Sequence, residues 1–164
     1  NIEKAMAFDS FVYSKLPPFK NNEKVFGKQE IYDRYDSIIG TEEYLLINAT
    51  DINFDSLYDI VTSFDGIMIP AHIDKSANSL LSNLGFIPPT SKFTCAEVKH
   101  TGFLDKLCEK HDYLKNCKII SNSDAHYLEN INEPIHYIFS ESKKIEDILK
   151  ALSLKNQDDE FKTN

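Results

Sequence analysis

The chain has 164 residues, 41% hydrophobic and 27% charged, which is typical of one globular domain with a sizeable core. Its net charge is −8 and it contains no lysine or arginine block, which argues against a protein that coats nucleic acid. A phosphorylated substrate is still compatible with this charge, because bound divalent metals reverse the local field. No apolar run approaches the ~20 residues that span a bilayer, so no membrane association is expected.

The three cysteines, Cys95, Cys108 and Cys117, form no Cys-x-x-Cys pair and no ladder of close spacings. An odd number of cysteines without a secretory segment favours free thiols in a reducing compartment. We therefore expect a cytoplasmic protein.

The first third of the chain predicts a helix followed by short strands. Residues 1 to about 15 read as a helix capped by Asn1 and stopped by Pro17 and Pro18. Residues 17–48 contain short β-prone pieces separated by turn residues, which predicts a β-hairpin insertion near the N-terminus. This insertion either covers the site as a lid or is purely structural.

From Asn48 onward, predicted helices and strands alternate. Such alternation indicates βα units and a mainly parallel sheet, in which the chemistry collects at the C-terminal ends of the strands. The polar tail, 155–164, is expected to be flexible. The expected helices lie near 51–64, 76–84, 102–111 and 145–154, and the expected strands near 66–71, 93–98, 118–121 and 135–139.

Two of the expected strands change abruptly from apolar to polar at their ends. The first is followed by His72 and Asp74, and the third by Asp124 and His126. Residues at i and i+2 of an extended segment point to the same side, so each pair can serve one site. Carboxylate and imidazole ligands suit Zn²⁺, Mn²⁺ or Fe²⁺. Each motif has an ordinary alternative, since Asp74 could cap the following helix and His72 could be a hydrogen-bonded structural histidine.

The remaining histidines carry a weaker signal. His100 and His111 flank an expected helix, where solvent-exposed positions are the ordinary role, and His136 lies in an expected strand, where packing is the usual role.

The segments Ile69-Pro-Ala-His-Ile-Asp74 and Ser121-Asn-Ser-Asp-Ala-His126 resemble the last two motifs of the PHP family, the polymerase and histidinol phosphatase domain. The similarity is greatest to stand-alone bacterial PHP proteins. The resemblance implies a distorted (β/α)₇ TIM-like barrel with two or three divalent metals at the strand ends. It also implies hydrolysis of phosphate esters by metal-activated water, on a phosphorylated small molecule or nucleotide, with nucleic acid possible only as substrate.

By this resemblance His72, Asp124 and His126 are metal ligands, and Asp124 is also the candidate catalytic residue. Glu97 matches a glutamate position often seen in the family, where site lining and structural hydrogen bonding are equally open. Asp74, Lys75 and Ser123 are candidates for lining the site or contacting phosphate, with solvation or helix capping as the alternative. Because Arg34 is the only arginine, phosphate recognition must use metals, lysines, hydroxyls or backbone amides.

The chain departs from the family in its first half. No His-x-His motif occurs, and the first histidine is His72. We therefore expect a partial PHP-type domain over residues 1–154, the C-terminal part of the barrel, truncated at its N-terminus. Such a fragment would be inactive by itself, and its exposed barrel surface would favour self-association.

Two other functions fit the sequence. A regulatory or interaction module could keep a PHP-like fold without a working metal cluster. An amidohydrolase-like enzyme shares the ligand chemistry but usually carries a metal-bridging lysine or a different order of histidines. Neither substrate nor metal identity follows from the sequence.

Overall fold

The computed structural model describes residues 1–154, which divide into two compact units. The N-terminal unit spans Asn1–Ser56, and the C-terminal unit begins at Leu57. The expected flexible tail, 155–164, lies outside the described residues. The assignment of residues 1–154 to one partial barrel domain stays a prediction.

The N-terminal unit begins with helix α1 (Ile2–Ser14), as predicted. The Asn1 side chain caps it by accepting a hydrogen bond of 3.0 Å from the backbone N–H of Lys4. The helix ends before Pro17 and Pro18, whose rings and missing N–H groups are incompatible with a helix interior. A single further turn, α2 (Glu23–Phe26), follows.

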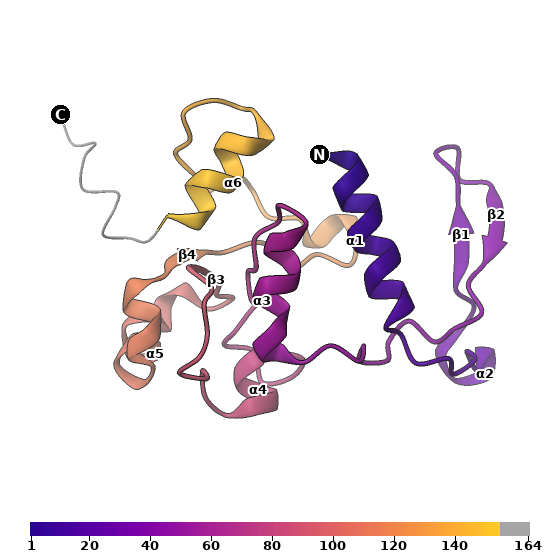
Figure 1. Ribbon diagram of the computed structural model, residues 1–164, viewed down its shortest axis with the longest axis horizontal. Coiled ribbons are helices and arrows are strands. Elements are labelled where there is room, and N and C mark those ends of the chain that lie inside the picture. The colour runs from indigo at the N-terminus through magenta and orange to yellow at the C-terminus, as the bar shows by residue number, and fades with distance from the viewer. Residues whose placement is uncertain (155–164) are drawn as a thin grey trace. The chain divides into compact units, whose positions relative to one another are not determined.

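The predicted hairpin within residues 17–48 is confirmed. Strand β1 (Glu30–Tyr32) pairs antiparallel with β2 (Ile38–Thr41), as Figure 1 shows. In the turn, Asp33 Oδ1 accepts hydrogen bonds from the backbone N–H groups of Tyr35 and Ser37 at 2.8 and 3.0 Å. Asp36 occupies the left-handed region with φ 59°, which short polar side chains tolerate.

The buried core lies in the C-terminal unit, because none of residues 1–56 is buried. The core combines apolar residues in and beside strand β3 (Cys95–Glu97) with residues from segments that precede strand β4 (Lys118–Ile120) and with one residue of helix α6 (Ile145–Ser153). Its members are Ile73, Phe93, Cys95, Ala96, Val98, Leu114, Cys117 and Ala151.

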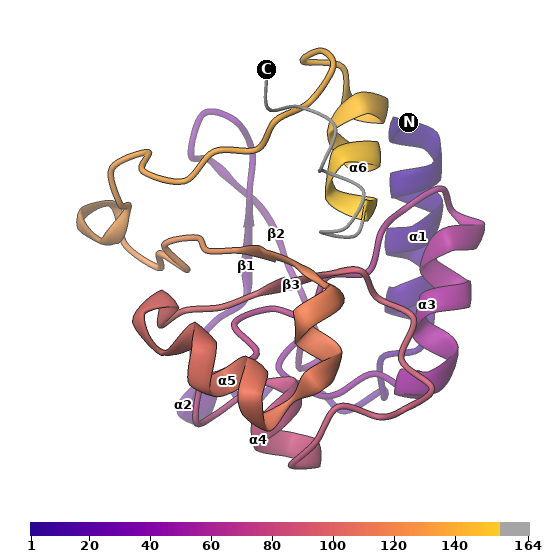
Figure 2. The same cartoon turned by 90° about the vertical axis from the view of Figure 1, so that its left-hand side faces the viewer.

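The C-terminal unit alternates helical turns with short strands, broadly as predicted. Figure 2 shows α5 (Leu104–Lys110), which packs beside the 3-10 helix η2 (Asp112–Asn116) that follows it in the chain. In chain order the elements are α3 (Phe54–Ser63), α4 (Leu80–Leu84), β3 (Cys95–Glu97), η1 (Thr101–Phe103), α5 (Leu104–Lys110), η2 (Asp112–Asn116), β4 (Lys118–Ile120), η3 (Leu128–Asn130) and α6 (Ile145–Ser153).

Helix ends in this unit follow local chemistry. Helix α4 begins later than expected because Ser79 caps it, and Ser79 and Ser82 exchange side-chain and backbone hydrogen bonds in a capping box. Gly85 ends it with φ 77°, a conformation that glycine adopts without strain. After α3, Gly66 passes so close to Val61 that an added Cβ would lie 2.9 Å from Val61 Cγ1.

The predicted parallel pairing is confirmed for β3 and β4. Cys95 faces Lys118 and Glu97 faces Ile120 in a parallel register. Both strands therefore deliver their C-terminal ends, and the loops that follow them, to one edge of this small sheet.

The prediction of a regular strand over 66–71 is wrong. The segment does run beside β3, since Glu97 N–H donates to Pro70 O at 3.0 Å and Glu97 O accepts from Ile73 N–H at 2.8 Å. A regular parallel ladder leaves one residue between two such partners, but here Ala71 and His72 both intervene. The extra residue, with His72 at φ 30°, interrupts the strand just before the candidate site.

The prediction of a strand over 135–139, with His136 packed inside it, is also wrong. Ile135 and Phe139 are 67% and 88% exposed, His136 is exposed, and the segment pairs with no strand among residues 1–154. Its apolar sequence has β propensity, but a strand also needs a neighbour to pair with. The described residues thus form a mixed α/β fold with two two-stranded sheets and no closed barrel.

Candidate functional site

Three loops that follow parallel segments meet at one edge of the β3–β4 sheet. The first carries His72 to Lys75, the second carries Lys99 and His100 after β3, and the third carries Ser121 to His126 after β4. Side-chain hydrogen bonds, many of them to backbone N–H groups, and the Lys75–Asp124 ion pair connect these loops. The arrangement agrees with the expectation that the chemistry collects at the C-terminal ends of parallel strands.

Glu97 ties all three segments together. Its Oε2 accepts a hydrogen bond of 3.0 Å from the backbone N–H of His72, and its Oε1 accepts one of 3.0 Å from Asn122 Nδ2. Both carboxylate oxygens are therefore used to hold the first and third loops against β3. Of the two roles left open by the sequence, the geometry favours structural hydrogen bonding for Glu97.

Asp74 organises the loop after β3. Its Oδ1 accepts from the backbone N–H of Lys99 at 2.7 Å, and its Oδ2 accepts from the backbone N–H and ring Nδ1 of His100 at 2.8 and 2.9 Å. Burial opposes ionisation, but these donors outweigh it and lower the pKa of Asp74 below its usual value. Asp74 does not cap the following helix, because Ser79 has that role.

Lys75 and Asp124 form an ion pair across the first and third loops. Lys75 Nζ lies 2.8 Å from Asp124 Oδ2, and the two side chains are 36% and 21% exposed. The hydrogen bond from Lys75, followed by weaker effects of the Lys75, His72 and His126 charges, lowers the pKa of Asp124. Asp124 is therefore ionised near neutral pH, and both histidines lie close enough to affect it electrostatically.

The backbone has a positive φ at two of the predicted ligands. His72, with φ 30°, lies in a region that residues with a Cβ seldom adopt, whereas Asp124, with φ 51°, has a short polar side chain that tolerates this conformation. Such residues cluster at binding and catalytic sites, where neighbouring contacts hold them in place. The hydrogen bond to Glu97 holds His72, and the Lys75 ion pair holds Asp124.

His72 also has a buried ring nitrogen, Nδ1, that makes no hydrogen bond within residues 1–154. A buried polar atom without a partner is costly, and an orphaned imidazole nitrogen is an available metal ligand. His126 is exposed, and Ser123 contributes its backbone oxygen, which accepts a hydrogen bond from Lys99 Nζ. The predicted site residues therefore share one neighbourhood with different degrees of burial.

The donors of this neighbourhood fit a divalent ion in kind but do not complete a site. An imidazole nitrogen of His72, the Asp124 carboxylate and the His126 imidazole are the ligand types that Zn²⁺, Mn²⁺ and Fe²⁺ accept. Within residues 1–154, however, no group of three or more His, Cys, Asp or Glu side chains is arranged to hold a metal. One Asp124 oxygen is already paired with Lys75. Metal binding stays a prediction.

Two of the cysteines are poorly suited to take part in chemistry at this site. Cys95 and Cys117 are buried, and burial raises the pKa of Cys95 to about 11. A thiol with such a pKa remains protonated at neutral pH and is a poor nucleophile.

Sequence reasoning missed His100 and Lys99. The Asp74–His100 pair joins residues 26 positions apart, so no local spacing indicates it. The available signal was that strands 66–71 and 93–98 were expected to lie parallel, which brings the residues after each strand to the same edge.

Among residues 1–154, no helix is both long enough and apolar enough to cross a membrane. Comparison of the chain with protein-family models, with curated proteins and with solved structures finds no match. The PHP resemblance accordingly rests on the two motifs, and the site is interpreted from its own geometry.

Proposed function

We propose that this chain is part of a cytoplasmic, metal-dependent phosphoesterase of PHP type. In this proposal β3 and β4 belong to the C-terminal part of a distorted (β/α)₇ barrel. The observation that carries the proposal is the Lys75–Asp124 ion pair at the ends of parallel segments, with both His72 and His126 close enough to lower the Asp124 pKa.

The residues would divide the work as follows. His72, Asp124 and His126 would hold divalent metal, which supplies an activated water and neutralises phosphoryl oxygens. Asp124 is ionised and so is ready to act as a ligand. Lys75 would move its ammonium group from Asp124 to a phosphoryl oxygen when substrate arrives, a role suited to a chain with one arginine. Further ligands would come from outside the described residues.

The substrate class follows from this chemistry. A phosphorylated small molecule or a nucleotide suits a site built from metal ligands and one lysine, and nucleic acid would enter only as substrate.

We also propose that the chain self-associates, because the loop after the site exposes large apolar residues. Leu128 and Phe139 are 85% and 88% exposed.

The test is hydrolysis of p-nitrophenyl phosphate with added Mn²⁺, measured on the longest natural chain that contains these residues. Loss of a residue that supports a metal ligand costs about 10–100-fold in activity, so Asp124→Asn and His72→Ala, which alter proposed ligands themselves, should each lower kcat/KM by more than about tenfold. Lys115→Gln is the matched control, since Lys115 pairs with Asp112 on an exposed helical turn. Unchanged turnover in both site variants would refute the proposal.

A second candidate is a regulatory or interaction module that keeps this fold without catalysis. It is favoured if the Lys75–Asp124 ion pair and the Glu97 hydrogen bonds are fixed parts of the structure that no metal or substrate displaces. The Lys75 ammonium neutralises Asp124 as a metal would, and both Glu97 oxygens are engaged in loop contacts. This candidate predicts no metal-dependent hydrolysis in any longer chain, and no gain of metal binding when Lys75 is removed.

A further inference from the structure

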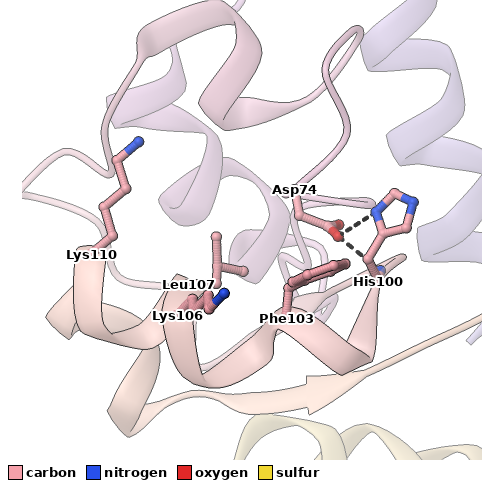
Figure 3. A pocket seen from close by; sticks show the side chains of 6 residues that line it. All are labelled: Asp74, His100, Phe103, Lys106, Leu107 and Lys110. Atoms are coloured by element: carbon pink, nitrogen blue, oxygen red, sulfur yellow. Dashed lines mark hydrogen bonds and ion pairs between the residues drawn. The ribbon is translucent and has the colours of Figure 1, made fainter.

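A separate pocket opens beside the candidate metal ligands, between the His72–Lys75 loop and helix α5. Its volume is about 280 Å³, just below the ~300–1,000 Å³ typical of small-molecule sites, so it suits one part of a ligand. Figure 3 shows Lys110 of α5 at one end of the lining and Phe103, His100 and Asp74 at the other. The lining residues are Asp74, His100, Phe103, Lys106, Leu107 and Lys110.

One wall of this pocket combines an aromatic ring with two positive charges. Phe103, Lys106, Leu107 and Lys110 have the spacing of one helical face, and the Lys106 ammonium lies 5.9 Å from the centre of the Phe103 ring. Neither lysine makes an ion pair within residues 1–154. Like charges at i and i+4 repel each other, and a bound anion would relieve that repulsion.

The opposite wall carries a carboxylate whose charge is already compensated. Asp74 accepts hydrogen bonds from the backbone N–H groups of Lys99 and His100 and from the His100 ring, and its side chain is only 11% exposed. The Asp74 carboxylate is therefore occupied by hydrogen-bond donors of the protein itself. Among the lining residues, the permanent positive charges are those of Lys106 and Lys110.

The pocket is connected to the candidate metal ligands by direct contacts. Asp74 stands two residues after His72 and accepts a hydrogen bond from the backbone of Lys99. The Lys99 side chain in turn donates to the backbone oxygen of Ser123, the neighbour of Asp124. A ligand that reaches from the Asp124 loop toward α5 would thus cross one continuous hydrogen-bonded surface.

We propose that this pocket recognises the organic part of the substrate, a group that carries a flat ring and a negative charge. The ring would lie against Phe103 and the negative charge beside Lys106 and Lys110. The assignment to substrate recognition rests on the proposed phosphoesterase function. Binding of a ring-bearing anion at α5 does not depend on metal, so it can succeed or fail separately.

The experiment uses phenyl phosphate as probe, with this chain in EDTA, and follows backbone amide shifts by two-dimensional NMR. Inorganic phosphate and phenol serve as comparison probes that carry only the charge or only the ring. The variants are Lys106→Gln with Lys110→Gln, and Phe103→Leu, which keeps an apolar side chain but removes the aromatic face. The control is Lys115→Gln, whose ammonium lies outside the pocket and pairs with Asp112.

Phenyl phosphate should shift amides of His100, Phe103 and Lys106 and bind more tightly than either comparison probe. The double lysine variant should weaken it by about fivefold or more, and Phe103→Leu should remove its advantage over inorganic phosphate. The control should bind as the parent does. Shifts centred elsewhere, or equal binding by the double variant and the parent, would overturn the proposal. If binding at α5 is found while His72→Ala and Asp124→Asn leave hydrolysis unchanged, the pocket stands and the phosphoesterase function fails.

Discussion

Lys75 Nζ and Asp124 Oδ2 lie 2.8 Å apart although 49 residues separate them in the chain. This pair joins the residue directly after the first of the two motifs that carry the family resemblance to the second motif, and it neutralises the carboxylate that is the best candidate metal ligand. The Lys75 ammonium group therefore competes with any divalent ion for the Asp124 carboxylate.

Removal of that competitor should strengthen metal binding. Lys75→Met keeps the apolar stem of the side chain and leaves Asp124 unpaired, so the affinity for Mn²⁺ should rise severalfold, by about 1 kcal/mol or less for so accessible a pair. Isothermal titration measures it. The matched control is Lys92→Met, which breaks the exposed pair with Asp59. A fall in Mn²⁺ affinity for Lys75→Met alone would mean that Lys75 supports the site rather than competing for it.

Glu97→Gln should lower the free energy of unfolding by weakening the contacts that hold the site loops. Both glutamate oxygens accept hydrogen bonds, from His72 N–H and from Asn122 Nδ2, whereas a glutamine presents one NH₂ group to a donor. The loss should be about 1–3 kcal/mol of unfolding free energy, measured by urea denaturation. Glu109→Gln, on exposed α5, is the control and should change little. Equal stability of both variants would show that Glu97 does not hold the loops.

Asp74→Ala should destabilise the loop after β3. It leaves the backbone N–H groups of Lys99 and His100 without their acceptor, at a cost of about 1–3 kcal/mol. Since the pKa of Asp74 is lowered in the folded state, its ionised form contributes stability above the ordinary aspartate pKa of about 3.9, and that contribution is lost as pH falls through the lower folded value. Melting temperatures of parent and Asp74→Asn should therefore converge as the pH falls below the folded-state pKa of Asp74. A gap that does not narrow as the solution is acidified would contradict this explanation.

Alkaline pH should destabilise the C-terminal unit through Cys95. Burial raises its pKa from 9.0 to about 11, so the unfolded chain ionises first. Its contribution is intact below pH 9 and is lost as pH rises through about 11, up to about 2–3 kcal/mol in all. Cys95→Ala should reduce the fall in unfolding free energy between pH 8 and pH 10.5, whatever its effect at pH 8. An unchanged fall would show that other groups, Tyr113 among them, account for it.

Local signals in the sequence predicted much of this fold. Asn1 before α1 and Gly85 after α4 act within a single helical turn, so their roles can be read from neighbouring residues. The parallel β3–β4 pair followed from alternating helices and strands. The predictions of strands over 66–71 and 135–139 are wrong because strand formation depends on a partner far away in the chain. The residues within a segment do not reveal whether such a partner is present.

In the candidate site, too, the features predicted from nearby residues differ from those that depend on contacts between distant parts of the chain. The sequence places His72, Lys75 and Asp124 together because each follows an expected strand, and the structure joins Lys75 to Asp124 in an ion pair, with His72 near enough to lower the pKa of Asp124. The pairing of Asp74 with His100 depends on the three-dimensional alignment of two loops 26 residues apart. Whether the three predicted ligands bind metal depends on distances that the sequence does not encode locally.

A titration of this chain with Mn²⁺, followed by paramagnetic broadening of amide NMR signals, tests the metal site most directly. Broadening should centre on the amides of His72, Asp124 and His126 and disappear in Asp124→Ala. Broadening centred elsewhere, or broadening that persists unchanged in Asp124→Ala, would contradict the assignment of these residues as metal ligands.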